Sequence, residues 1–208
     1  MSGDAPLPPP ARPLPDRRTE PHVQVPPGGR DALTVAPDAS YAAQAARAPL
    51  AEPEAALAGE MIGRPPRGRP APAVRCRWGL PAVLRVDPQL GDGTPFPTTF
   101  WLACPLANRR VGTLEAGGMM VALNRRLADE PELAAAYAAA HARYVAFRDQ
   151  LGPAVPGDPS AGGMPGRVKC LHALYGHHLA TDDNPVGRLV AEELEPLDCP
   201  APCVGGQT

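Results

Sequence analysis

Five cysteines are the residues of this sequence best able to do chemistry. All of them follow residue 75, at Cys76, Cys104, Cys170, Cys199 and Cys203. An odd number of cysteines, in a chain that shows no secretory signal segment, is typical of metal-binding or catalytic thiols rather than of a disulfide framework. Three residues separate Cys199 from Cys203, a spacing found in zinc-binding pairs. Thiolates suit both zinc and iron–sulfur clusters, so we expect one of these two cofactors.

The predicted metal ligands are drawn from the five cysteines and His177. If the first and third predicted strands end at the same sheet edge, Cys76 and Cys104 converge on the helix that Cys170 opens. The alternative interpretation is that these thiols are small buried apolar side chains, which is the common fate of free cysteine. Cys199 and Cys203 argue against it, because their tail is polar and rich in proline.

Cys170 also fits a nucleophilic role. A helix N-terminus and the adjacent Lys169, the single lysine of the chain, would both lower its thiol pKa. His177 follows two helical turns later on the same face, but about 10 Å away along the axis, and His172 lies on a different side of such a helix. The sequence therefore leaves open whether the protein is an enzyme.

A glycine-rich loop before Cys170 offers a second kind of site. Gly162, Gly163, Arg167 and Lys169 precede a predicted helix start, where backbone amides attract anions. This pattern indicates an alternative function, an enzyme acting on a phosphorylated small molecule. The loop matches no phosphate-binding motif, and loops of this composition also serve as plain connections.

Charge and hydropathy exclude several classes of protein. The net charge is −2, and the arginines are not interleaved with aromatic residues, so we expect no nucleic-acid partner. No run approaches the roughly 20 apolar residues that cross a bilayer, and Met1 precedes Ser-Gly-Asp rather than a basic and apolar signal segment. We therefore expect a cytoplasmic protein with no membrane-spanning segment.

Proline dominates the first part of the chain, where 16 of the 30 prolines precede Cys76. Aromatic and β-branched residues are sparse there, so this part cannot bury enough apolar surface to offset its chain entropy. We predict that residues 1–52 form a disordered leader that makes no buried contact with the rest. Residues 53–208 are predicted to form a single domain with a cysteine-containing C-terminal tail.

The rest of the chain alternates between short β-type runs and helical patterns. Residues 73–77, 82–86 and 98–104 are predicted strands, separated by turn-forming residues. Helices are predicted over residues 54–62, from 106, from 129 to 151, over 168–180 and over 185–194. This order indicates an α+β fold, a small antiparallel three-stranded sheet covered by four or five helices.

Several short blocks, taken together, resemble a known family. They are Arg75-Cys76, Cys104-Pro105, Lys169-Cys170-Leu171-His172 and Asn184-Pro185-Val186-Gly187, with His177 and the turn-rich residues 92–98 and 160–164. Over about residues 62–203 the chain resembles the domain of unknown function 501 family, which is mostly actinobacterial. The resemblance implies no activity. It implies a possible protein partner in cell division or polyphosphate metabolism, because family genes often lie beside those for a septum-formation initiator and an exopolyphosphatase-like protein.

Overall fold

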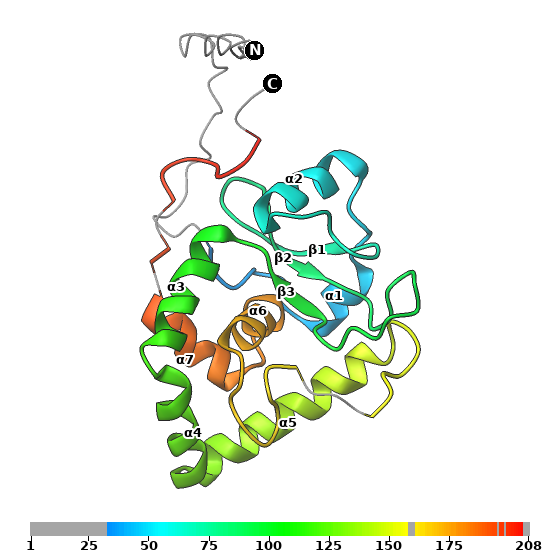
Figure 1. The fold of residues 1–208 in the computed structure, drawn as a ribbon. Coiled ribbons are helices and arrows are strands. Elements are labelled where there is room, and N and C mark those ends of the chain that lie inside the picture. Colours follow the sequence, from blue (N-terminus) through cyan, green and yellow to red (C-terminus); the bar gives the residue numbers. More distant parts are fainter. Residues whose placement is uncertain (1–32, 158–160, 195, 198, 206–208) are drawn as a thin grey trace, which may run out of the picture.

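The computed structural model describes residues 33–157, 161–194, 196–197 and 199–205. These residues form an α+β fold with a three-stranded antiparallel sheet, as the sequence predicts (Figure 1). The strands are β1 (Ala71–Arg75), β2 (Pro81–Arg85) and β3 (Phe100–Leu102). The helices are α1 (Tyr41–Ala46), α2 (Glu52–Ile62), α3 (Pro105–Ala116), α4 (Met119–Asp129), α5 (Pro131–Arg148), α6 (Leu171–Thr181) and α7 (Pro185–Leu194).

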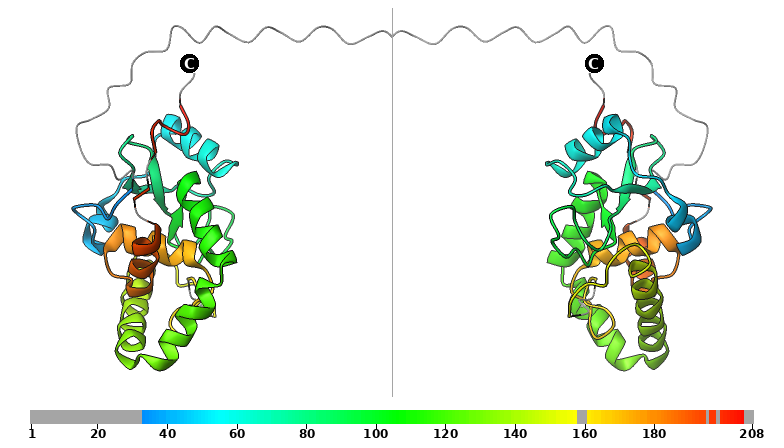
Figure 2. Two further views of the ribbon diagram at one scale, coloured as in Figure 1. Left: turned by 90° about the vertical axis from the view of Figure 1, so that its left-hand side faces the viewer. Right: turned by 90° about the vertical axis from the view of Figure 1, so that its right-hand side faces the viewer.

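The sheet carries helices on both faces, which explains why every residue of β2 is buried. Successive side chains of a strand point to opposite faces. Val83 and Phe100 therefore belong to the larger apolar core around α6, and Leu84 packs with Ala58 of α2 in a smaller one. Figure 2 shows α2 at one end of the molecule and α5 at the other, with the sheet and α6 between them.

Helix α6 lies at the centre of the fold, and every residue in it except His172 is buried. Two glycines permit its close packing against neighbouring elements. A Cβ atom on Gly176 would lie 3.0 Å from the carbonyl oxygen of Phe100 in β3. A Cβ on Gly187 of α7 would overlap the carbonyl oxygen of Leu174. Larger side chains at either position would force α6 away from its partners.

Helices α3, α4 and α5 follow one another along the edge of the core. The helical pattern predicted from residue 106 is divided at Gly117-Gly118, where Gly118 has a φ of 86° and caps α4. Helix α5 contributes the apolar seam expected from its sequence, with Tyr137, Tyr144 and Phe147 buried. It ends at Arg148 rather than at the predicted residue 151. Within the described residues, no helix is both long and apolar enough to cross a membrane.

The N-terminal boundary of the packed domain lies before the predicted residue 52. Leu33 is 1% exposed and belongs to the main apolar core. In α1, the Gln44 side chain is fully buried and donates hydrogen bonds to the carbonyl oxygens of Ala73 (3.1 Å) and Ala180 (2.9 Å). Residues 33–51 were predicted to lack buried contacts and instead pack on β1 and α6; the rest of the predicted leader, residues 1–32, lies outside the described residues.

This correction has a clear physical reason. Residues 33–51 contain too few apolar side chains to form a core of their own. A few of their side chains instead complete a core that the rest of the chain forms. The buried Arg85 of β2 donates to the carbonyl oxygens of Gln44 and Ala45, so α1 also satisfies a charged group of the sheet. Such long-range contacts leave no periodic signal in a short segment.

Replacement of Gln44 by alanine should destabilise the domain. It removes both hydrogen bonds and leaves the carbonyl oxygens of Ala73 and Ala180 without this donor, which costs roughly 1–3 kcal/mol. The melting temperature should fall by several degrees, because about 1 kcal/mol shifts that of a domain of this size by roughly 2–4 °C. Calorimetry measures the shift, and Gln150→Ala at an exposed position is the matched control. Equal melting temperatures of the two variants would contradict the packing of α1.

Candidate functional site

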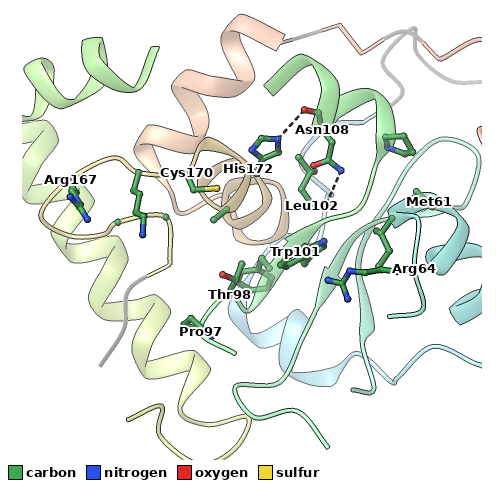
Figure 3. A pocket seen from close by; sticks show the side chains of 17 residues that line it. Met61, Arg64, Pro97, Thr98, Trp101, Leu102, Asn108, Arg167, Cys170 and His172 are labelled. Carbon is green, nitrogen blue, oxygen red and sulfur yellow. Dashed lines mark hydrogen bonds between the residues drawn. The ribbon is translucent and has the colours of Figure 1, made fainter. Parts of the chain in front are cut away.

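A cavity of about 790 Å³ opens beside the N-terminus of α6. Its walls come from the end of α2, from β3, from α3, from the loop before α6 and from α6 itself. Figure 3 shows Arg64 and Arg167 on opposite sides of this pocket, with Trp101 and Cys170 between them. The four residues predicted to bind an anion, Gly162, Gly163, Arg167 and Lys169, all line it, as do Cys170 and His172.

The loop that carries these residues is tied to two helices. Asn124 of α4 accepts from the Val168 amide (2.9 Å) and donates to the Val168 carbonyl oxygen (2.9 Å). The Tyr137 hydroxyl of α5 donates to the carbonyl oxygen of Arg167 (3.2 Å). Arg167 and Lys169 therefore project into the pocket from a loop whose backbone is fixed.

The backbone amides of the loop are largely used within the protein. Lys169 N–H and Cys170 N–H donate to the Gly162 carbonyl oxygen (2.7 and 3.2 Å), and Arg167 N–H donates to that of Gly163 (3.1 Å). Both glycines have positive φ values, 64° and 95°, and allow this tight turn. An anion in the pocket would therefore meet the charged side chains rather than a ring of free amides.

Cys170 precedes α6 instead of lying within it. The helix was predicted from residue 168 but begins at Leu171, and Cys170 is its N-cap with an extended backbone (φ −145°, ψ 109°). The side chain of an N-cap residue reaches the second and third residues of the helix. Here the Cys170 side chain makes no capping hydrogen bond, but its sulfur lies within 4.8 Å of a ring nitrogen of His172.

The neighbour of Cys170 is thus His172 and not His177. Glu115 of α3 completes the group: its Oε1 accepts from the Leu171 amide (2.7 Å) and from His172 Nδ1 (3.2 Å). One ligand-type atom from each of Cys170, His172 and Glu115 lies within 4.8 Å of the other two. Sequence reasoning missed Glu115 because it lies on a separate helix, and set His172 aside because it assumed that Cys170 is helical.

The surroundings of His172 favour its protonated form. Nε2 lies 3.1 Å from the carbonyl oxygen of Asn108, which can only accept, so Nε2 carries a hydrogen. Nδ1 lies 3.2 Å from the Glu115 carboxylate, and the ring also lies close to the Cys170 sulfur. The proximity of the Cys170 sulfur and the negative charge of Glu115 outweigh partial burial and raise the pKa of His172 to about 9. Near pH 7 the ring is an imidazolium.

The pKa of the Cys170 thiol shifts in the opposite direction. Burial by itself raises the pKa of the thiol, but the proximity of His172 and of the Ala173 amide outweighs burial and lowers it. Cys170 and His172 therefore favour each other's charged form. A metal ion bound to the same three residues would need Nδ1 without its proton, which both neighbours oppose.

The other four cysteines meet at a second, small cavity of about 20 Å³. Cys76 follows β1, Cys104 is the N-cap of α3, and Cys199 and Cys203 lie in the C-terminal tail. The indole N–H of Trp78 donates to the carbonyl oxygen of Cys199 (3.0 Å) and holds the tail against the hairpin turn. Burial raises the pKa of the Cys104 thiol, and the nearby thiols of Cys76 and Cys199 raise it further.

His177 lies away from both groups of cysteines, in the aromatic core. Its ring stacks on Phe100, with centroids 5.7 Å apart, and meets Tyr144 edge-on. Asn184 donates from Nδ2 to His177 Nδ1 (3.0 Å), because its Oδ1 already accepts from the Gly187 amide (2.8 Å). Nε2 therefore carries the hydrogen and faces the Tyr41 hydroxyl at 2.6 Å. With both nitrogens engaged, this histidine is a core residue in the structure.

Comparison with protein families gives one match. The model of the family described as protein of unknown function (DUF501) covers residues 72–192, more than half of the chain. The chain belongs to this family. Searches of curated proteins and of solved structures found no match. The family segment includes Glu115, Arg167, Cys170 and His172, and it ends before Cys199.

Because His177 is buried in its neutral form, we expect acid to lower the stability of the folded protein. Burial lowers the pKa of His177 to about 3, whereas the unfolded chain binds a proton near pH 6.5. The stabilising contribution is thus complete above pH 6.5 and is lost as the pH falls toward 3. The free energy of unfolding should drop by up to about 1.4 kcal/mol per pH unit below pH 6.5.

Urea unfolding between pH 7 and pH 5 measures this slope. His177→Gln should show a smaller slope, because the titrating group is gone. His172→Gln is the matched control and should keep the slope well below pH 6.5, where His172 is protonated in both the folded and the unfolded state. A wild-type stability that is constant over this range would contradict a buried neutral imidazole.

Proposed function

We propose that the domain binds an anionic small molecule, such as a phosphorylated one, in the pocket beside the N-terminus of α6. One observation carries this proposal. Three cationic side chains from two distant parts of the chain line the same cavity of about 790 Å³: Arg64 on one side, and Arg167 and Lys169 on the other. Isolated surface arginines and lysines are usually solvated singly, whereas side chains that converge on one concave site can share a ligand.

The balance of charge within the pocket supports an anionic ligand. His172 also lines the pocket, but its positive charge is paired with the carboxylate of Glu115, so the charge offered to a ligand comes from the arginines and the lysine. The nearby carboxylate of Glu115 is engaged with the Leu171 amide and with His172, so it is already compensated. Arginine and lysine at the rim would steer and hold a phosphate or carboxylate group.

The remaining walls fit an apolar body attached to that anionic group. Met61, Phe100, Trp101 and Leu102 contribute apolar surface, and the Arg64 guanidinium lies 5.7 Å above the Trp101 ring. Pockets of roughly 300–1,000 Å³ with mostly apolar walls and a few convergent polar groups are typical of small-molecule sites. The volume suits a ligand larger than inorganic phosphate.

Replacement of Arg167 and Lys169 together by alanine tests the proposal. Binding of pyrophosphate and of a nucleoside monophosphate, measured by calorimetry, should weaken by at least about tenfold, which is about 1.4 kcal/mol. The matched control is the double replacement of Arg69 and Arg125 by alanine, which removes the same charge from exposed positions outside the pocket. If the wild-type protein binds neither probe, or if both double variants lose affinity equally, the proposed anion site is wrong.

A metal site formed by Cys76, Cys104, Cys199 and Cys203 is a second candidate function. Its support is the convergence of four cysteines, from two sheet ends and the tail, on one small cavity. Thiols that raise each other's pKa are close enough for their negative forms to repel, and a cation would relieve this repulsion. Four thiolates match the tetrahedral preference of zinc and also suit an iron–sulfur cluster.

In the structure, the four thiols are not gathered as closely as the ligands of a bound metal ion would be. Among the described residues, the group of at least three ligand-type side chains whose atoms all lie within 4.8 Å of one another is Glu115, Cys170 and His172, and no three of these four thiols form such a group. Binding would therefore draw the tail toward Cys76 and Cys104. Arg110 donates to the carbonyl oxygens of Leu194 (3.1 Å) and Pro196 (2.9 Å), so the start of the tail is already held near α3.

Metal analysis of protein purified without oxygen tests this candidate. We expect about one zinc ion per chain, or the brown colour and iron content of a cluster, and Cys104→Ser should lose most of the metal. Cys170→Ser is the matched control and should retain it, because Cys170 does not line this cavity. A folded wild-type domain without metal, or equal loss from both variants, would contradict a four-cysteine site.

A protein partner in cell division or polyphosphate metabolism, and a cytoplasmic location, stay predictions that rest on the sequence alone.

A further inference from the structure

We propose that Cys170 and His172 form a thiolate–imidazolium pair that transfers acyl groups from an anionic substrate. Cys170 is the nucleophile, and His172 is the proton donor and acceptor. Glu115 is a positioning residue that holds the imidazolium. The inference rests on the proposed anion site, because the same pocket would bind the charged part of the acyl donor.

The geometry brings a nucleophile, a proton carrier and an open cavity to one place. Cys170 and His172 both line the pocket. One sulfur, nitrogen or oxygen atom from each of Cys170, His172 and Glu115 lies within 4.8 Å of the other two. The positive end of the α6 dipole also stabilises a thiolate at the N-cap. Figure 3 shows Cys170 beside His172 at the pocket wall, with Arg167 on the far side of the cysteine.

Two acceptors hold the ring of His172 in position. The Asn108 carbonyl oxygen takes the Nε2 hydrogen at 3.1 Å, and Asn108 is itself fixed by donation from Nδ2 to the Leu102 carbonyl oxygen at 3.1 Å. Glu115 faces Nδ1 at 3.2 Å and is anchored by the Leu171 amide. Because Nε2 is engaged by the Asn108 carbonyl oxygen, the Nδ1 hydrogen is the proton that His172 can deliver to a leaving group.

Acyl transfer fits this arrangement better than phosphoryl transfer to sulfur. A phosphocysteine site needs several free amides around the thiolate to hold three phosphoryl oxygens. Two amides next to the sulfur are already engaged, that of Leu171 by Glu115 and that of Cys170 by Gly162. A planar carbonyl group needs fewer donors, and a protonated histidine supplies what its leaving group requires.

The proposed step balances without an oxidant or a cofactor. The Cys170 thiolate attacks the carbonyl carbon of an ester or acyl phosphate, and a carbon–sulfur bond forms as the bond from carbon to the leaving oxygen breaks. The leaving group takes the Nδ1 proton, and His172 becomes neutral. His172 then removes a proton from water, and the water oxygen attacks the thioester carbon. The carbon–sulfur bond breaks, the carboxylic acid is released, and the original thiolate–imidazolium pair is restored.

Alkylation by iodoacetamide, followed at Cys170 by peptide mass spectrometry across pH 5 to 10, tests the thiolate. The midpoint of the wild-type profile should lie below that of an ordinary thiol, which loses reactivity below about pH 8.5. His172→Gln should move the midpoint upward toward that ordinary value. A wild-type profile like that of an ordinary thiol would overturn the proposal.

Acetyl phosphate, a small anionic acyl donor, tests the transfer step. Wild-type protein should carry an acetyl group on Cys170 or release phosphate and acetate continuously, and Cys170→Ala should do neither. His172→Gln should slow the reaction by roughly 100-fold or more, the usual contribution of a general acid. In Glu115→Gln the reaction should persist, but its alkaline limit should fall below pH 9, because the negative charge that favours the imidazolium is gone.

Two further readouts separate this inference from the anion site. Iodoacetate should react faster with Cys170 than iodoacetamide does, and the Arg167→Ala/Lys169→Ala variant should lose this preference while it keeps the pH profile. If the wild type shows no preference, the anion site is wrong and the ion pair stands. If the preference is present but acetyl phosphate does not react, the acyl-transfer proposal is wrong. Zinc protection of Cys170 that a chelator reverses would also overturn it and indicate a metal site.

Discussion

Burial of α6 along almost its whole length is the constraint on which the other elements depend. A helix that contacts protein along its whole length must satisfy each polar side chain internally, because water does not reach it. His177 is therefore neutral, held between Asn184 and Tyr41, and Thr181 donates to the carbonyl oxygen of His177 at 2.9 Å. The carbonyl oxygen of Ala180 is reached by Gln44 from α1. Segments far apart in sequence thus lie next to α6 because they supply hydrogen-bond partners for its buried polar groups.

The same constraint fixes the candidate site. His172 is the one residue of α6 that is not buried, and it lies in the first turn, next to Cys170. Since the body of the helix is packed against β3 and α7, its first turn cannot shift without disturbing the core. The preceding loop is tied to α4 by Asn124 and to α5 by Tyr137. A pocket built on such fixed elements holds reactive groups at constant distances, which catalysis and specific binding both require.

Local patterns predicted most of the fold and little of the site. The seam of α5 and the cap of α7 by Asn184 follow from residues close in sequence, and both are present in the structure. The packing of α1 depends instead on Gln44 finding the carbonyl oxygens of Ala73 and Ala180, which no local pattern reveals. The four residues of the predicted anion loop do share a pocket, but its opposite wall comes from α2 and β3.

The cysteines show why residue type alone could not assign the chemistry. Sequence reasoning treated them as one set of ligands, whereas the structure divides them between two electrostatic environments. Cys104 lies near other thiols, which share its tendency to become negative, so its pKa is raised by burial and by their repulsion. Cys170 lies beside a protonated imidazole, so its pKa is lowered despite burial. A group of like acids gains most from an added cation, while a thiolate already paired with a cation is ready to react with carbon. The position of each cysteine relative to charges from other elements therefore decides between binding and reactivity, and only the tertiary fold sets that position.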